Sequence, residues 1–338
     1  MLLNVSSAYI EITNICNLDC RSCYNRSGQP HPRKELSLAQ IKQIVPRLVG
    51  EFGCTSVALA GGEPTLHSEF DEILSYLLSV PQLAVSIVTN GTTLPKNLTL
   101  AYRKYPQLKL QISLDGSTEE INALTRGKGN FEKAVSFINE LKDAGKTPVM
   151  KMVVSARNVQ DTEAYYRLAV SLGCDPDFSP INRMGNASED WDALEPTAKQ
   201  MLFVLRTIDR LNHEYHKNVI LPSCLQKCPF TDESTALSVL IKCDGTMHPC
   251  QMLYDEAYSL GNILRDEASE LAVRYAEISR LATERINHTD GCKKCLARTQ
   301  CHRGCMAISV MRQNGPLGDD GACGFRKLQL LDFGVVSK

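Results

Sequence analysis

Three features are missing from this sequence, and each absence excludes a class of protein. No stretch approaches the roughly 20 consecutive apolar residues that a membrane helix needs. The first residues, Met1-Leu2-Leu3-Asn4, are not a basic region followed by an apolar run, so we expect no secretory signal. Lys and Arg number 37 against 38 Asp and Glu, and this balance argues against binding nucleic acid or an acidic membrane through bulk charge. We therefore expect a cytoplasmic protein with no nucleic-acid or membrane partner.

Internal repeats and low-complexity tracts are also absent, so the chain is not organised as a repeat array. Its 338 residues exceed the usual size of a single core. We predict a large domain over residues 1–187, a helical bridge over 188–221, and a small domain over 222–338 in which metal replaces much of the hydrophobic core.

Short β-rich runs alternate with amphipathic, helix-length segments over the first 185 residues or so, which is typical of a parallel α/β sheet. The expected strands cover residues 9–13, 56–60, 85–89, 108–114, 149–154 and 177–180. The expected helices cover residues 37–49, 68–78, 130–144, 161–172 and, in the bridge, 196–217. Ser37 and Gln40 could form a capping box, and Pro46 predicts a kink. Six βα units predict an α/β fold of the partial (β/α)6, TIM-like barrel type.

Fourteen cysteines are far too many for an ordinary cytosolic enzyme. In a reducing compartment, clustered thiolates bind metal rather than form disulfides. Cys16, Cys20 and Cys23 follow the first strand as C-x3-C-x2-C. A loop that supplies three thiolates to a four-iron cluster leaves one iron open to a small chelating molecule. A zinc loop or buried structural cysteines are the alternatives.

The turn Gly61-Gly62-Glu63-Pro64 comes directly after the second strand. Paired glycines allow a backbone to approach a ligand closely, and Glu63 could bind a cationic amino group. Together, this turn and the cysteine loop resemble the radical S-adenosylmethionine superfamily. That resemblance implies that Cys16, Cys20 and Cys23 bind a 4Fe-4S cluster, and that one electron from it splits S-adenosylmethionine to give a 5'-deoxyadenosyl radical.

The resemblance also implies a set of cofactor contacts. The Gly61–Pro64 turn would bind the cofactor, with Gly61, Gly62 and Glu63 on the methionine amino group. Further implied contacts are Asn90, Ser113, Asp115, Arg126, Asn158 and the segment 183–186. Asp115 could instead cap the turn that follows it. Superfamily members usually have an aromatic residue before the third cysteine, where this chain has Ser22, and Tyr24 could compensate.

Nine cysteines gather in the last 115 residues. Two zinc ribbons could use such spacings. The order Gly245-x4-Cys250, C-x2-C-x5-C-x3-C and a last cysteine resembles the SPASM extension of radical S-adenosylmethionine maturases, which implies two auxiliary 4Fe-4S clusters. The first would use Cys228, Cys250 and Cys305 with Cys224, for which Cys243 competes. The second would use Cys292, Cys295, Cys301 and Cys323. Isolated Cys54 and Cys174 are expected in the core.

The resemblance favours a radical enzyme that abstracts hydrogen from a peptide or protein substrate and modifies it oxidatively, with the auxiliary clusters accepting an electron. Reduced flavodoxin or ferredoxin is the expected electron donor. Because many such maturases carry a peptide-recognition domain before the first cluster and Cys16 arrives early here, a separate recognition protein could supply it. Tailoring of a small cofactor such as a haem precursor, or a non-catalytic zinc protein, are the alternatives. No general base can be named, because the strand register decides which side chains point into the barrel.

Overall fold

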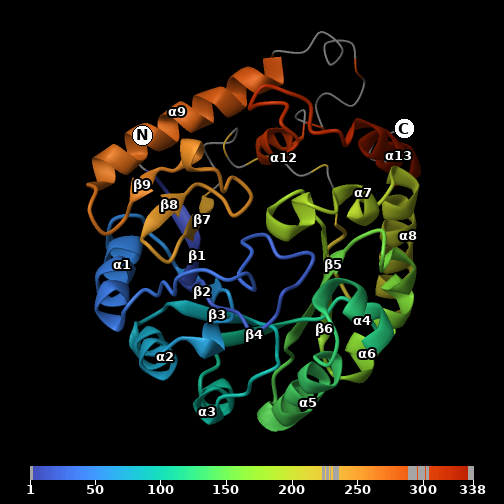
Figure 1. The fold of residues 1–338 in the computed structure, drawn as a ribbon, viewed down its shortest axis with the longest axis horizontal. Helices are drawn as coiled ribbons and strands as arrows, with labels where there is room; N and C mark the ends of the chain where they lie inside the picture. Colours follow the sequence, from blue (N-terminus) through green and yellow to red (C-terminus); the bar gives the residue numbers. More distant parts are fainter. Residues whose placement is uncertain are drawn as a thin grey trace.

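The computed structural model describes residues 3–222, 225, 228, 230, 236–287, 295, 301 and 304–333. One sheet of nine strands runs through it in the order β6-β5-β4-β3-β2-β1-β7-β8-β9. Strands β1 to β6 are parallel and follow one another in sequence order from one edge inward, as successive right-handed βα units require. In Figure 1 the helices lie outside the curved sheet, and the C-terminal elements lie beside β1.

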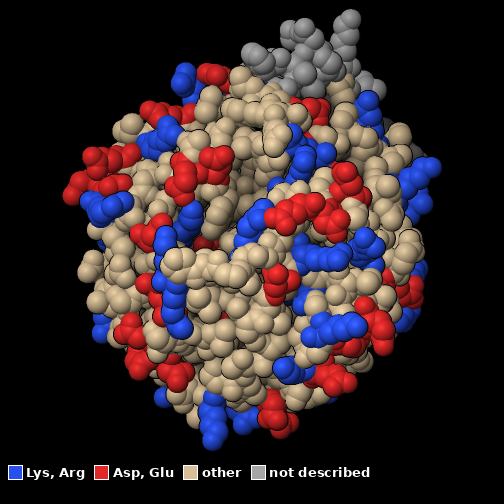
Figure 2. Space-filling model, viewed as in Figure 1, with Lys and Arg blue, Asp and Glu red and all other residues tan. Residues whose placement is uncertain are grey.

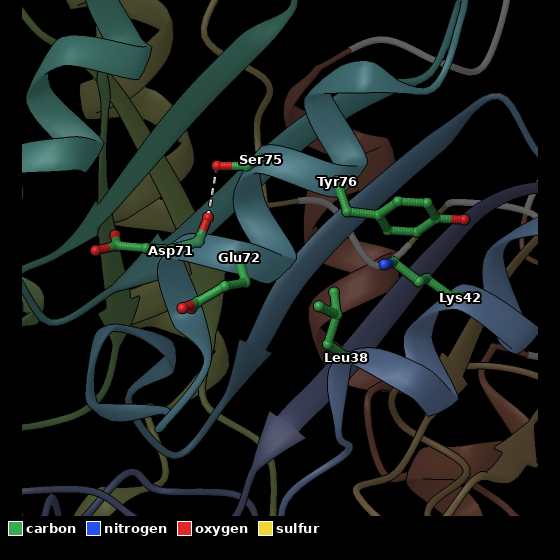
Figure 3. A pocket seen from close by; sticks show the side chains of 6 residues that line it. All are labelled: Leu38, Lys42, Asp71, Glu72, Ser75 and Tyr76. Atoms are coloured by element: carbon green, nitrogen blue, oxygen red, sulfur yellow. Dashed lines mark hydrogen bonds between the residues drawn. The ribbon is translucent and has the colours of Figure 1, made fainter.

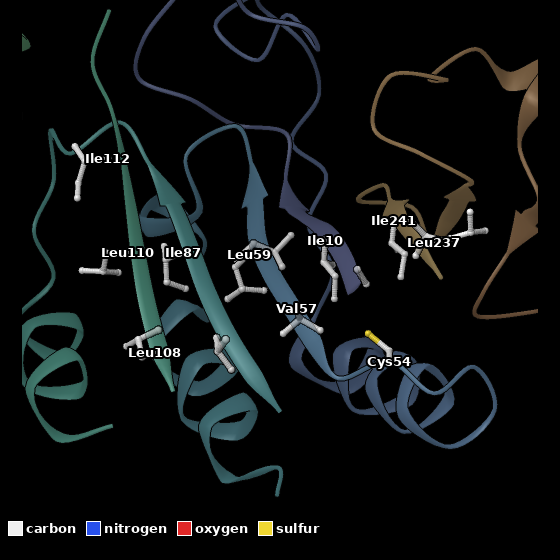
Figure 4. Close-up of a cluster of buried hydrophobic side chains, with 14 of the residues drawn as sticks. Ile10, Cys54, Val57, Leu59, Ile87, Leu108, Leu110, Ile112, Leu237 and Ile241 are labelled. Atoms are coloured by element: carbon white, nitrogen blue, oxygen red, sulfur yellow. The ribbon is translucent and has the colours of Figure 1, made fainter. Parts of the chain in front are cut away.

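The six predicted strands are all present, with ends that differ by a few residues. They are β1 (Val5–Thr13), β2 (Ser56–Gly61), β3 (Ala84–Thr89), β4 (Leu108–Ser113), β5 (Val149–Val154) and β6 (Asp175–Pro180). Their buried aliphatic side chains form a continuous layer, which Figure 4 shows for Ile10, Leu59, Ile87 and Leu110. Cys54 and Cys174 are buried in the same core, as predicted. The fold is thus an α/β partial barrel.

The helices of the barrel follow the strands. They are α1 (Leu38–Gly50), α2 (Phe70–Ser79), α3 (Lys96–Lys104), α4 (Glu119–Arg126), α5 (Phe131–Leu141) and α6 (Thr162–Ser171). Ser37 and Gln40 form the predicted capping box of α1, and the helix continues through Pro46. Helices α3 and α4 were not predicted. Between α1 and α2 the outer surface has a hollow lined by Leu38, Lys42 and Tyr76 (Figure 3), which contains no cysteine.

The bridge contains α7 (Trp191–Leu194) and α8 (Ala198–Tyr215), the latter capped by Thr197 and Gln200. Helix α8 packs against α6 and against α13 (Cys323–Asp332). It therefore connects the barrel wall to the end of the described chain. The three-part division at residues 187 and 221 stays a prediction.

The C-terminal third extends the barrel sheet rather than forming a sheet of its own. Strand β7 (Leu237–Ile241) pairs in parallel with β1, and β8 (Thr246–His248) and β9 (Gly261–Asn262) follow antiparallel. Helix α9 (Ala268–Asn287) contacts β9, and α12 (Met306–Met311) lies near α13 in Figure 1. Leu237 and Ile241 join the barrel's hydrophobic cluster. The two cysteine regions are thereby attached to one continuous framework.

The described helices include none that is long and apolar enough to cross a membrane. On the face shown in Figure 2, Lys and Arg side chains are interspersed with Asp and Glu, and neither sign dominates a broad area.

Candidate active site

The cysteine loop leaves the carboxyl end of β1, where barrel enzymes place their catalytic residues. Backbone contacts hold it against the turn that follows β2. The amide of Gly62 donates to the carbonyl of Thr13 at 2.8 Å, and the amide of Glu63 donates to that of Ile15 at 2.8 Å. The turn and the cysteine loop are thus one unit.

The two glycines of this turn are required by the cysteine loop itself. Gly61 has a φ of +128°, and a Cβ at Gly62 would lie 2.0 Å from the Ile15 carbonyl oxygen. A side chain at either position would push the loop away. Pro64 begins a short 3-10 turn, Pro64–Leu66, for which its fixed φ is suited.

The three thiols of the loop influence one another. Burial raises the pKa of the Cys16 thiol to about 11, and the neighbouring charges of Glu63 and Cys23 add to the rise. Burial also raises the pKa of Cys20 to about 12, although the Arg126 guanidinium opposes this. Buried thiols of high pKa become thiolates when a metal centre binds them, so the donor set fits an iron-sulfur cluster.

Arg126 is held beside Cys20 by a buried ion pair. Its Nε lies 2.9 Å from Oδ2 of Asp115, which is fully buried. Oδ2 also accepts from the Thr125 hydroxyl at 2.9 Å, and Oδ1 accepts from the Val153 amide at 2.8 Å. Asp115 therefore fixes a cation next to the cysteine loop, where it can stabilise negative charge on thiolates.

The carboxylate of Glu63 is held by hydrogen bonds from residues of two strand ends. Oε1 accepts from the hydroxyls of Thr65 at 2.7 Å and Thr89 at 2.8 Å, and Oε2 accepts from the Asn90 amide at 2.7 Å. Only 1% of the residue is exposed. These bonds join the β2 turn to the end of β3.

The other predicted cofactor contacts differ in whether their polar side-chain groups already form hydrogen bonds within the protein. The Asn90 amide group donates to Asn17 Oδ1 at 2.9 Å and lies 3.8 Å from the Cys16 sulfur. Ser113 ends β4 and is half-buried, and its hydroxyl forms no hydrogen bond within the described part of the chain, so it is available to a ligand. Asn158 is buried, and its side-chain nitrogen donates to the backbone carbonyls of Asp115 and Val153, both at 2.9 Å. Asn158 thus ties the ends of β4 and β5 together.

The segment after β6 contacts the same cysteine loop through residues 185 and 186. The Asn186 backbone amide donates to the Cys23 carbonyl at 2.9 Å, and its side-chain nitrogen donates to the Cys20 carbonyl at 2.9 Å. Gly185 approaches so closely that a Cβ would lie 2.2 Å from the Cys23 carbonyl oxygen. The side-chain oxygen of Asn186 is buried and has no hydrogen-bond partner among the described residues. An orphaned acceptor here fits a bound molecule with donors of its own.

Sequence reasoning missed a buried polar cluster under the cysteine loop. Glu11 on β1 is 3% exposed, and its Oε1 accepts from the Tyr24 hydroxyl at 2.6 Å. Its Oε2 accepts from the Tyr254 hydroxyl at 3.2 Å. The signal was present in the sequence, because Tyr9, Glu11 and Thr13 alternate with Ile10 and Ile12 along the strand. Tyr24 therefore belongs to this cluster.

A second group of thiols gathers beside a cavity of about 970 Å³. Cys228, Cys250 and Cys305 line it from the C-terminal third, while Lys151 and Asp177 line it from the barrel. Burial raises the pKa of Cys250 to about 12, and the nearby Cys305 and Cys228 thiols add to this rise. The structure thus brings together three of the four predicted ligands of the first auxiliary cluster.

The structure gives less information about the other cysteines of the C-terminal third. Burial raises the pKa of Cys243 to about 11, and the charges that act on it come from Glu11, Asp244 and Lys34 rather than from another thiol. Cys295 and Cys301 are half-buried, and Cys323 is exposed. Cys224 and Cys292 lie outside the described residues.

Within the described part of the chain, no three Cys, His, Asp or Glu side chains are arranged to hold a single metal ion. A four-iron cluster binds each thiolate at a different iron atom and so needs a wider spacing. Both cysteine groups supply thiols, which are the donors that iron-sulfur clusters use.

Comparison with known proteins agrees with this geometry. Residues 10–169 match the family model of the radical SAM superfamily, and residues 233–296 match that of SPASM, an iron-sulfur cluster-binding domain. The chain is 29% identical over 322 residues to mycofactocin maturase MftC of Mycolicibacterium smegmatis, covering 93% of this chain and 81% of that protein. It is 26% identical over 276 residues to the sporulation killing factor maturation protein SkfB of Bacillus subtilis, covering 78% of this chain and 64% of that one.

The solved structure of native anSMEcpe with bound AdoMet and Cp18Cys peptide has the same fold, with a TM-score of 0.77 at 20% identity. The superposition covers 97% of this chain and 96% of that one. The matches favour a radical enzyme, with S-adenosylmethionine and iron-sulfur clusters as cofactors, over a non-catalytic zinc protein. The chain thus carries a radical SAM domain over residues 10–169 and a SPASM iron-sulfur cluster-binding domain over residues 233–296.

Proposed function

We propose that this enzyme matures a peptide, cleaving S-adenosylmethionine reductively and abstracting hydrogen from a side chain or α-carbon. The observation that carries the proposal is the shared cavity, which reaches from barrel strands β5 and β6 to Cys228, Cys250 and Cys305. A substrate bound there would lie between the barrel and an auxiliary cluster. The relatives named maturases support a peptide as that substrate.

The cysteine loop would supply three ligands to the catalytic cluster, through Cys16, Cys20 and Cys23. Reductive cleavage of S-adenosylmethionine at that cluster supplies the radical. The chain's own residues would hold the cofactor. The Gly61–Pro64 turn would bind its amino group, and the free Ser113 hydroxyl and the Asn186 side-chain oxygen would bind its polar groups. Arg126 would offset negative charge beside Cys20.

Three residues have narrower roles in this proposal than their motifs suggest. The Glu63 carboxylate already accepts bonds from Thr65, Thr89 and Asn90, so it would bind a methionine amino group only through its remaining lone pair. Asn158 and Asp115 would act by fixing the strand ends and Arg126, since their polar groups are used within the protein.

The first auxiliary cluster would use Cys228, Cys250 and Cys305, with Cys224 as the fourth ligand, because Cys243 is influenced by Glu11 and Asp244 rather than by these thiols. The second would use Cys292, Cys295, Cys301 and Cys323. Reduced flavodoxin or ferredoxin would supply electrons in the cytoplasm, and a separate protein could present the peptide.

The test uses the full chain, reconstituted anaerobically with iron and sulfide and reduced with dithionite. It is incubated with S-adenosylmethionine and synthetic peptides encoded by short reading frames beside its gene. We expect one peptide to raise 5'-deoxyadenosine release and to lose mass in units of two hydrogens. Tetrapyrroles serve as the competing substrates, and turnover with a tetrapyrrole alone would contradict the proposal. The Cys20→Ala variant controls for release that does not depend on the cluster.

A further inference from the structure

The buried carboxylate of Glu11 has a position that a structural role does not explain. Ile10 and Ile12, its neighbours on β1, are fully buried in the hydrophobic core. Because successive side chains of a strand point to opposite faces, Glu11 lies on the inner face of the barrel. A carboxylate in such a place costs free energy unless it is paired or is used.

The bonds that Glu11 accepts are donated by neutral groups. They come from the Tyr24 hydroxyl at 2.6 Å, the Tyr254 hydroxyl at 3.2 Å and the Asn25 side-chain amide at 3.4 Å. Among the described residues, no Lys, Arg or His forms an ion pair with it. Burial raises the pKa of Glu11, and the three hydrogen bonds together with the positive charge of Lys242 oppose this only in part. A carboxylate with a raised pKa is a better proton acceptor near neutral pH than an ordinary one.

Several other titratable groups surround this carboxylate. Lys242, at the end of β7, lies 4.6 Å from the centre of the Tyr254 ring, but its ammonium group pairs with Glu256 at 2.5 Å. The His248 ring stacks on Tyr254, is fully buried, and has an unpartnered Nε2. The other groups that act on this cluster are Tyr9, Cys23, Glu63, Cys243 and Asp244.

Glu11 also lies between the two cysteine regions. Tyr24 directly follows Cys23, and Tyr254 comes four residues after Cys250. The two tyrosine rings meet edge to face with centroids 5.8 Å apart, and both donate to the same carboxylate. Glu11 is 3% exposed while both tyrosines are half-buried, so a proton would reach Glu11 through one of them.

We propose that Glu11 accepts the proton that the substrate radical loses on oxidation, and that the Tyr254 hydroxyl passes it on. Hydrogen abstraction by the 5'-deoxyadenosyl radical leaves a carbon radical on the substrate. That radical gives one electron to an oxidised iron-sulfur cluster of the SPASM domain and one proton to the Tyr254 oxygen. The hydroxyl proton of Tyr254 moves to Oε2 of Glu11 in the same step. The tyrosine stays neutral, Glu11 becomes a carboxylic acid, and the substrate has lost two hydrogens in total.

This inference rests on the proposed function, and its test separates the two. With the peptide that the wild-type enzyme modifies, Glu11→Gln should keep 5'-deoxyadenosine release and deuterium transfer from a labelled peptide within a few-fold. Product formed per deoxyadenosine should fall about 100-fold, the loss expected when a general base is removed. Glu11→Asp should restore part of the product formed per deoxyadenosine, and Tyr254→Phe should lower this ratio. If Glu11→Gln forms as much product per deoxyadenosine as the wild type, the inference is overturned. If the wild-type enzyme modifies no peptide, the proposed function is overturned instead.

A second measurement needs no substrate. Infrared spectra of the reconstituted wild-type protein should show a carboxylic-acid band that loses its proton at a higher pH than an ordinary glutamate does, because burial raises the pKa of Glu11. The band should be missing in Glu11→Gln and kept in Glu35→Gln. Glu35 is the matched control, because its carboxylate pairs with Arg33 at 2.7 Å and has a pKa lowered to about 2 despite partial burial. A spectrum that Glu11→Gln leaves unchanged would contradict the proton-accepting role.

Discussion

The two cysteine regions are built on different physical principles. The loop with Cys16, Cys20 and Cys23 is held by strand ends on every side, through Gly62, Gly185 and the Asp115–Arg126 pair. The C-terminal thiols Cys228, Cys250 and Cys305 instead surround a cavity of about 970 Å³. The first group of thiols is held by hydrogen bonds and close backbone contacts, whereas the second borders an open volume that a cluster could fill. Metal should therefore matter more to folding in the second region than in the first.

The largest effect should come from Cys20→Ala. Removal of this ligand should lower bound iron by about four atoms per chain and abolish deoxyadenosine release, because the vacant iron is lost with its cluster. Circular dichroism should stay close to that of the wild type, since the surrounding strand ends remain. Cys174→Ala is the matched control, a buried thiol of the core that should leave iron and release unchanged. Equal iron content in both variants would show that the loop binds no cluster.

The next effect concerns the second region. Cys250→Ser should remove about four irons and lower the thermal midpoint of unfolding, while deoxyadenosine release continues. Cys243→Ser should do neither, because Cys243 is not influenced by the cavity thiols. Iron analysis and calorimetry on the two anaerobic samples give the comparison. Loss of iron from Cys243→Ser but not from Cys250→Ser would reverse the ligand assignment.

Much of the first region could be predicted from the sequence. The six strands follow from short alternating runs, and the cysteine spacing after β1 locates the loop. The direction of Glu11 was also readable, because Ile10 and Ile12 mark the core side of the strand. The packing role of the two glycines after β2 could not be inferred from the sequence. The Gly61-Gly62 pair was predicted to admit a ligand, which stays a prediction, and the structure shows that the pair also admits the backbone of residues 13–16.

The second region was less predictable for two physical reasons. Strand β7 pairs in parallel with β1 across more than 200 residues of sequence, and no local pattern reports such a partner. Helix α9 spans 20 residues between two cysteine groups, where the density of cysteines pointed to short, metal-held elements. The predicted metal ligands can therefore be named from the sequence, but the framework that carries them is set by long-range packing.

The smallest and most selective effect should separate two similar ion pairs, one in each region. Asp115 pairs with Arg126 beside Cys20, and Asp320 pairs with Arg326 while accepting from the Cys305 amide at 2.8 Å. Both carboxylates are at most 1% exposed. Because each change removes the negative charge that faces a buried guanidinium, Asp115→Asn and Asp320→Asn should each lower the free energy of unfolding by about 3–5 kcal/mol.

Their effects on iron should differ. Asp115→Asn should weaken binding of S-adenosylmethionine but keep most iron, since backbone contacts still hold the cysteine loop. Asp320→Asn should release iron from the auxiliary site, because the charge-assisted bond to the Cys305 amide is weakened beside the cavity that Cys305 lines. Urea unfolding, iron analysis and cofactor titration on the same samples measure all three quantities. Equal iron loss in both variants would mean that the two regions depend on their clusters to the same degree, against the difference in construction that the structure shows.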